Sequence, residues 1–237
     1  LPVPKTVFGH GWLLVGGEKM SKSMLPGIAP SQITDVFGSD AFRYYFLSAI
    51  TFGQDGSFSW EDLAARYQAE LANGFGNLAS RVIAMVAKYY DGVVPAPGAL
   101  TTDDLVTITA AATATREANE AIERFAPDAA IAAIRKLVDA LNLYVTEQQP
   151  WSIAKDPEQR ERLATVLSTA IRGVGALAIL LSPVVPKATA RLWAALGADG
   201  DVEAVNILDA GAFDGAGNTV TPLDPPLFPR VETLDPA

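Results

Sequence analysis

The region from residue 60 to residue 196 divides into five helix-length segments, and this pattern most constrains the fold. Asp91-Gly92 ends the first segment, Pro127-Asp128 starts the third, and Asp156-Pro157 starts the fourth. The predicted helices cover residues 60–90, 103–125, 127–147, 157–181 and 183–196. Because short links join them, we expect an α-helical bundle.

The first 58 residues predict a mixed structure. The expected elements are a buried strand over 7–15, a loop over 16–27, helices over 30–37 and 40–49 with Ser39 as N-cap of the second, and a turn over 53–57. The tail from residue 198 is rich in glycine, proline and acids, which predicts an irregular strap over the surface. We therefore expect a mainly α protein in three parts: residues 1–58, 59–197 and 198–237.

The composition is that of a globular protein and excludes several classes of site. The chain has 237 residues, of which 49% are hydrophobic and none is cysteine, so neither a disulfide nor a thiolate metal site can form. The longest apolar stretch, Gly173 to Leu181, is too short to cross a bilayer. No basic segment followed by an apolar one opens the chain. We expect a cytoplasmic protein with no membrane partner.

The net charge of −9 is concentrated in the tail. Residues 197–237 contain eight acids and one base, which gives −7 and leaves −2 for the preceding 196 residues. A nearly neutral body can still carry a local basic surface, so the total charge does not exclude a nucleic-acid partner.

A cationic loop is predicted at Lys19-Met20-Ser21-Lys22-Ser23, just after Gly16-Gly17. Two lysines three positions apart, with hydroxyl groups beside them, suit a loop that grips a triphosphate while its negative charge moves during reaction. For a lysine pair taken alone, an exposed basic turn without function is the alternative.

Further segments accompany this loop in a recognisable order. They are residues 9–15 (GHGWLLV), 52–60 (FGQDGSFSW), 72–81 (ANGFGNLASR) and 147–151 (EQQPW). The loop is similar to the KMSKS signature of class I aminoacyl-tRNA synthetases, and the whole set, from Leu1 to about Phe228, resembles methionyl-tRNA synthetases. The resemblance implies the end of a class I Rossmann-type catalytic domain, with the KMSKS loop and short stem-contact helices, followed by an α-helical anticodon-binding bundle. It implies a methionine–tRNA ligase, which activates methionine with ATP and transfers it to tRNA-Met in protein synthesis.

The resemblance also implies roles for the loop residues. Lys22 would contribute most to catalysis by offsetting charge on the phosphates, and Lys19 would assist it. Ser21 and Ser23 would hold the loop or donate to phosphate oxygens, and Met20 completes the ATP-binding segment. ATP would enter as its Mg²⁺ complex, and no metal site is expected within the chain.

Two further groups of residues are candidates for RNA recognition. Asn77 and Arg81 lie four positions apart on one helix face, where an amide and a guanidinium can together read a base edge. Trp151 follows Pro150 at a helix end, where an exposed indole can stack on an unpaired base. Without the resemblance, Asn77 and Arg81 would be read as solvent-exposed surface residues, and Trp151 would be read as a core residue. The resemblance instead implies that all four bind the CAU anticodon, with Pro150 directing the indole.

His10 is the single histidine of the chain. We expect it to be a satisfied polar group on the predicted strand, because adenylation of an ionised carboxylate needs no base. A class I synthetase also needs a HIGH-type motif with two histidines, which a chain with one histidine cannot contain. We therefore expect this chain to be the carboxyl-terminal half of the enzyme and to be inactive without the other half.

Three readings remain open from the sequence. The leading one is the methionyl enzyme; the others are another class I synthetase, such as a cysteinyl or leucyl type, and a non-catalytic helical tRNA-binding module. Two structural details are also open. Asp40 and Arg43 form either an ion pair linking the loop to the bundle or a weak surface pair, and Gly74 and Gly76 mark either close helix packing or a kink.

Overall fold

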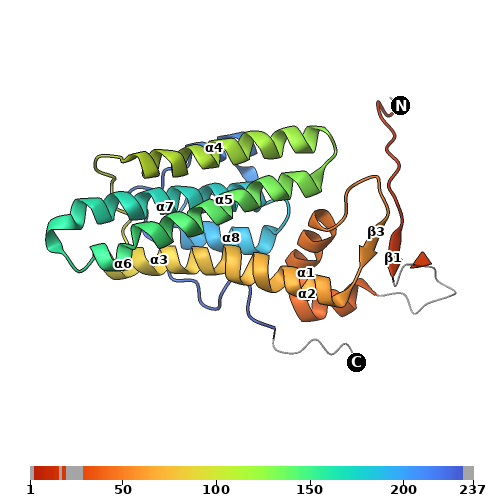
Figure 1. Ribbon diagram of the computed structural model, residues 1–237, viewed down its shortest axis with the longest axis horizontal. Helices are drawn as coiled ribbons and strands as arrows, with labels where there is room; N and C mark the ends of the chain where they lie inside the picture. Colours follow the sequence, from red (N-terminus) through yellow and green to blue (C-terminus); the bar gives the residue numbers. More distant parts are fainter. Residues whose placement is uncertain (1–2, 16–17, 20–28, 232–237) are drawn as a thin grey trace.

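A computed structural model describes residues 3–15, 18–19 and 29–231. Several helices run roughly along the long axis, and a small sheet with an extended amino-terminal arm lies at one end (Figure 1). The long-axis helices are α3 (Asn77–Tyr89), α4 (Thr102–Glu123), α5 (Pro127–Gln148), α7 (Arg160–Leu181) and α8 (Pro186–Ala195). The predicted helical bundle is confirmed.

The sheet has the strand order β2-β1-β3 within the described residues. Strand β1 (Leu13–Val15) pairs antiparallel with β2 (Glu18–Lys19) and parallel with β3 (Gly56–Phe58). The prediction of a buried strand over residues 7–15 is wrong for 7–12, which lie before the start of β1, and Val7 and Phe8 are exposed. The predicted loop over 16–27 likewise contains strand β2. The predicted turn over 53–57 ends early, because β3 begins at Gly56.

Helix α1 (Pro30–Ser48) contains the break that the sequence predicted between two helices. Gly38 has φ 83° and ψ 163°, a conformation that interrupts the helix and that glycine adopts without steric strain. Of the two possibilities left open for Asp40 and Arg43, an ion pair between them is not among the salt bridges of the described residues. Asp40 instead accepts from the N–H of Ala188, and Arg43 donates to carbonyl oxygens in the turn between α7 and α8.

The segment predicted as one helix from Trp60 to Tyr90 has three parts. Helix α2 (Trp60–Arg66) begins at Ser59, whose hydroxyl accepts from the N–H of Asp62 at 3.0 Å, as the capping pattern predicted. A π-helix, η1 (Tyr67–Gly76), follows and continues into α3. The helix ends where predicted, because Asp91 and Gly92 both have positive φ, 50° and 81°.

The remaining helices differ from the predictions mainly at their ends. A short helix, α6 (Pro150–Ile153), and a 3₁₀ turn, η2 (Pro157–Gln159), lie between α5 and α7. Asp156 caps the turn as expected, with its carboxylate accepting from the N–H of Glu158. The predicted start of the last helix at Ser182-Pro183 is wrong, since those residues form a turn and α8 begins at Pro186.

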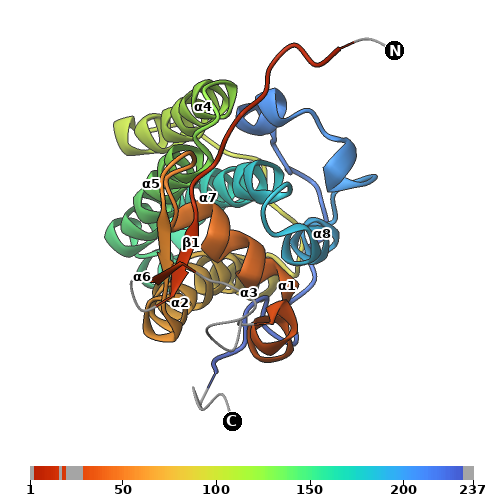
Figure 2. The ribbon, with the colours of Figure 1, turned by 90° about the vertical axis from the view of Figure 1, so that its right-hand side faces the viewer.

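Helix α7 lies at the centre of the bundle, with α4 and α5 on one side and α8 on the other (Figure 2). It is buried from Leu163 to Leu181 apart from Arg172, which is half-buried. Its length and mean hydropathy would suit a membrane span, but 94% of that apolar window is buried inside the protein, as in a core helix. At Gly173 an added Cβ would stand 2.3 Å from Cδ2 of Leu141, so glycine permits α5 to approach closely.

The tail is more tightly integrated than the predicted surface strap. It contains two 3₁₀ segments, η3 (Val202–Ala204) and η4 (Ile207–Ala212), and several of its apolar side chains are buried. Val94 and Val220 exchange backbone hydrogen bonds with the opposite segment, as Val94 N donates to Asn218 O and Val220 N donates to Gly92 O. Phe228 packs against Tyr67 and Phe75. The tail therefore helps close the core.

Candidate nucleic-acid interface

Asn77 and Arg81 lie on the first two turns of α3, as the four-residue spacing predicted. Asn77 is exposed and Arg81 is half-buried. Asn77 also lines a pocket of about 410 Å³ between the helix and the carboxyl-terminal tail, which contributes Phe228 and Arg230. The Asn77 amide is therefore accessible to a ligand.

The π-helix just before Asn77 explains the glycines of this segment. An added Cβ at Gly74 would lie 3.0 Å from the carbonyl oxygen of Ala69, and one at Gly76 would lie 3.0 Å from that of Leu71. Both carbonyls are five residues back, as the wider π-helical turn requires. Val138 of α5 also lies 3.7 Å from the position of a Gly74 Cβ. That distance is an ordinary van der Waals contact, so the close backbone approach within the π-helix is what favours glycine at both positions.

Trp151 extends from a sharp reversal between α5 and α6. Gln149 has φ 46° and ψ 56°, a left-handed conformation, and its carbonyl accepts from Ser152 N at 2.7 Å and Ile153 N at 3.2 Å. Pro150 is buried, whereas the Trp151 side chain remains 40% exposed. The indole is thus held at a helix start with much of its surface open to solvent.

The packing of α5 against η1 places Arg81 and Pro150 at a similar position along the long axis of the bundle. Asn142 Nδ2 donates to the carbonyl oxygen of Gly74 at 3.4 Å, and α3 and α5 run in the same direction (Figure 1). Pro150 comes eight positions after Asn142, and Val82 comes eight positions after Gly74. Since each helical residue advances by about 1.5 Å, Pro150 reaches the level of Val82, next to Arg81.

A buried polar network connects the helices at this end of the bundle. It was not predicted from the sequence. Its centre is the carboxylate of Asp104, which is 0% exposed. Arg162 donates to both of its oxygens at 2.6 and 3.0 Å, and Tyr144 donates at 2.5 Å. Thr101 donates through both its N–H and its hydroxyl. The spacing of Thr101 and Asp104 is a capping-box pattern and was the available signal.

Burial would by itself raise the pKa of Asp104, but the surrounding donors outweigh it. The hydrogen bonds from Arg162, Tyr144 and Thr101 together hold the pKa of this carboxyl at about 2. Burial first, and then the carboxylate of Asp104, raise the pKa of the Tyr144 phenol. The aspartate is therefore ionised and the tyrosine is a neutral donor over the physiological pH range.

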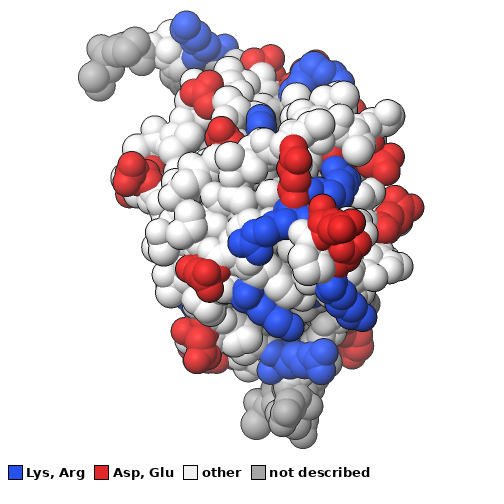
Figure 3. All heavy atoms as spheres, turned by 90° about the vertical axis from the view of Figure 1, so that its left-hand side faces the viewer, with Lys and Arg blue, Asp and Glu red and all other residues white. Residues whose placement is uncertain are grey.

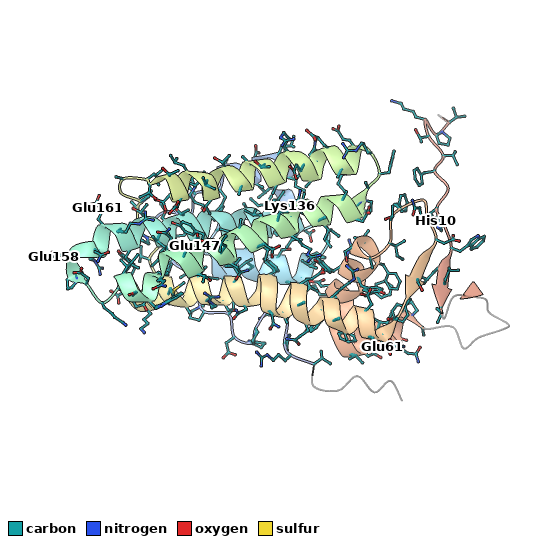
Figure 4. The ribbon with its side chains drawn as sticks, in the orientation of Figure 1. His10, Glu61, Lys136, Glu147, Glu158 and Glu161 are labelled. Carbon is teal, nitrogen blue, oxygen red and sulfur yellow. The ribbon has the colours of Figure 1, made fainter. Side chains whose placement is uncertain are left out.

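Basic side chains gather on the end face of the bundle, over α6 and the neighbouring end of α3 (Figure 3). Exposed bases stand at the ends of the elements that meet here: Lys88 in the last turn of α3, Lys155 after α6, and Arg160 at the start of α7. Arg160 lies 4.5 Å from the ring centroid of Tyr90, so the ends of α3 and α7 are in contact. Acidic residues share the same end, where Figure 4 shows Glu147, Glu158 and Glu161.

Of the predicted ATP-binding segment, Lys19 ends strand β2. Met20, Ser21, Lys22 and Ser23 lie outside the described residues. Among the described residues, no group of three His, Asp or Glu side chains is arranged to hold a metal ion.

The expectation that His10 is a satisfied core group on a strand is wrong. His10 lies before β1, is exposed, and its Nδ1 lies 2.8 Å from the carbonyl oxygen of Gly11. It stacks loosely on Phe52, which in turn stacks on Phe8. Figure 4 shows His10 at the end of the molecule remote from Glu147 and Glu158.

Comparison with known proteins assigns both parts of the chain. Residues 1–83 match the family model of tRNA synthetases class I (M), and residues 94–222 match that of the anticodon binding domain of methionyl tRNA ligase. A methionine–tRNA ligase of Streptomyces coelicolor is 48% identical over 98% of this chain, and one of Enterococcus faecalis is 41% identical over 98%. The chain spans less than half of these relatives, 44% and 35% of their lengths.

Solved structures agree with the sequence comparisons. A Mycobacterium tuberculosis methionyl-tRNA synthetase bound by methionyl-adenylate superposes with a TM-score of 0.89 at 31% identity, covering 97% of this chain and 45% of that one. Its apo form gives a TM-score of 0.86 at 29% identity, covering 98% and 45%. The fold and the matched segments are those of a class I aminoacyl-tRNA synthetase. Within that class, the chain belongs to the methionyl-tRNA synthetase family.

Proposed function

We propose that this chain is the part of a methionine–tRNA ligase that supplies the KMSKS loop and binds the CAU anticodon of tRNA-Met. The observation that carries the proposal is the placement of an exposed indole, Trp151, at the level of the Asn77/Arg81 face of α3. Such a combination offers a stacking platform beside hydrogen-bonding groups, which is how unpaired RNA bases are commonly bound.

Each residue has a distinct role in this proposal. Trp151 stacks on an anticodon base, an interaction worth roughly 1–3 kcal/mol per base. Asn77 offers both a donor and an acceptor to a base edge, and Arg81 offers a guanidinium to a base or a phosphate. Pro150 fixes the backbone before the indole, because its ring restricts φ. The bases Lys88, Lys155 and Arg160 attract the RNA backbone to this face.

The catalytic part of the proposal rests on the signature loop. We infer that Lys22 stabilises charge on the phosphates of Mg²⁺-ATP as methionine is adenylated, with Lys19 assisting. Ser21 and Ser23 hold the loop or donate to phosphate oxygens, and Met20 completes the loop. A class I site also requires a HIGH-type motif with two histidines, which a chain with one histidine cannot contain, so we expect the chain alone to catalyse no pyrophosphate exchange. We keep the division into residues 1–58, 59–197 and 198–237, and a cytoplasmic location, as parts of this proposal.

Footprinting on a tRNA-Met transcript tests the proposal. The wild-type chain should protect nucleotides of the anticodon loop, and Trp151→Ala should lose that protection while keeping its fold. Trp12→Ala serves as the matched control, because Trp12 is also exposed, at 58%, but belongs to the opposite end of the molecule. Protection confined to other parts of the tRNA, or unchanged in Trp151→Ala, would contradict anticodon binding by this face.

A further inference from the structure

The amide of Gln148 is held from two sides at the end of α5. Its oxygen accepts from Nη2 of Arg162 at 2.6 Å, and its Nε2 donates to the carboxylate of Asp103 at 3.0 Å. Arg162 belongs to α7 and Asp103 to α4, so Gln148 connects the ends of three helices. The same Nη2 also donates to Asp104 at 3.0 Å, which joins Gln148 to the buried network.

Only two residues separate Gln148, whose amide is held by Arg162 and Asp103, from Trp151. The backbone of both residues is conformationally restricted. Gln149 holds a left-handed conformation, which a residue with a side chain keeps only where its surroundings enforce it. Pro150 has a fixed φ and a buried ring. Few free torsions remain in the backbone between the clamped amide and the tryptophan. The direction of the indole therefore depends on where Gln148 is held.

Stability alone does not account for this network. Compared with apolar side chains packed in its place, a buried ion pair adds little net stability, because removing both charges from water offsets most of their attraction. Its geometry, in contrast, is specific: the guanidinium of Arg162 uses two arms on Asp104 and shares one of them with Gln148. A lysine in its place would keep the charge but could not span these partners.

We propose that the Asp104–Arg162–Gln148 network is a positioning device that aims Trp151 at the anticodon. Asp104 fixes Arg162, Arg162 fixes Gln148, and Gln148 sets the reversal from which the indole projects. None of the three touches RNA in this account, so they act through Trp151. The part that concerns RNA rests on the proposed function; the part that concerns the indole does not.

The first test needs no RNA. In the full chain labelled with 5-fluorotryptophan, the ¹⁹F resonance of Trp151 is identified by its loss in Trp151→Phe. Arg162→Lys and the milder Gln148→Ala should shift or broaden this resonance. Arg66→Lys is the matched control, since Arg66 also pairs with carboxylates, Asp62 and Glu70, and its side chain is 29% exposed against 23% for Arg162. A Trp151 resonance unchanged in both folded network variants would overturn the proposal.

The second test measures dissociation constants for anticodon stem–loops with CAU and altered anticodons. Arg162→Lys should raise the dissociation constant for the CAU loop roughly fivefold or more, the lower range of one lost base stack. The double variant Arg162→Lys/Trp151→Ala should bind the CAU loop no more weakly than Trp151→Ala alone, because both changes remove the same interaction. Independent, additive losses would contradict positioning. If the wild-type chain fails to discriminate, the proposed function fails, and the fluorine resonance still decides whether the network aims the indole.

Discussion

The carboxylate of Asp40 accepts a hydrogen bond from the backbone N–H of Ala188 at 2.7 Å, although the two residues are 148 positions apart. Ala188 lies in the first turn of α8, so Asp40 caps a helix to which it does not belong. One turn later in α1, Arg43 donates to the carbonyl oxygens of Pro183 at 2.6 Å and Val184 at 3.1 Å. The helix that follows the signature loop is thereby joined to the turn between α7 and α8.

Replacing Asp40 by alanine should destabilise the protein. Losing a helix cap lowers the free energy of unfolding by about 1–2 kcal/mol, and the buried N–H of Ala188 is then left without a partner. Urea unfolding measures the change, with Asp35→Ala as the control, because Asp35 is exposed on the same helix. Equal, small effects of the two substitutions would show that the cap contributes nothing.

The stability of the bundle should depend on acid through Asp104. Its pKa is lowered in the folded protein from 3.8 to about 2, so the folded state binds this proton less readily than the unfolded state. The resulting stabilisation, about 2 kcal/mol, is fully present above pH 5 and is lost as the pH falls toward 2. Unfolding measured across this range should show the loss in the wild type and a flatter profile in Asp104→Asn. If the free energy of unfolding of the wild type and of Asp104→Asn fell equally with pH, the acid dependence could not be assigned to Asp104.

Gly173 should tolerate no larger side chain. The Cβ of alanine would stand 2.3 Å from Cδ2 of Leu141, a fully buried side chain that has no space to retreat. We expect Gly173→Ala to lower the free energy of unfolding by about 1–3 kcal/mol through overpacking, despite the better helix propensity of alanine. Thermal or urea unfolding checks the value. Gly9→Ala, which meets no atom within 4 Å, should change stability by less than about 0.5 kcal/mol.

Local signals in the sequence were enough to predict several of the helix ends. Ser59 before Trp60, Asp91-Gly92 and Asp156-Pro157 each form a cap or a stop that depends on neighbouring residues only, and the structure has each one in place. The break at Gly38 is of the same kind. Asn77 and Arg81 also lie on one helix, as their spacing indicated, whereas Pro150 and Trp151 lie on the short helix α6, which was not predicted. The binding role of all four stays a prediction.

The features that the sequence did not predict depend on contacts between distant segments. The π-helix forms where Gly74 packs beside Val138 and Asn142, which no local pattern encodes. Asp40 and Arg43, one helical turn apart, looked like an ion pair, yet each finds a partner about 140 positions away. Phe228 is buried against η1, although the tail around it has the composition of a surface loop.

Binding of anticodon stem–loops tests the central claim most directly. The dissociation constant of the wild-type chain should be lower for a CAU loop than for loops with each anticodon base changed, and Trp151→Ala should bind the CAU loop more weakly than the wild type does. Losing one stack of roughly 1–3 kcal/mol corresponds to roughly a 5- to 150-fold weaker affinity for the CAU loop. Trp12→Ala should bind as the wild type does. Equal affinity of the wild-type chain for all the loops would contradict the assignment of this face to the anticodon.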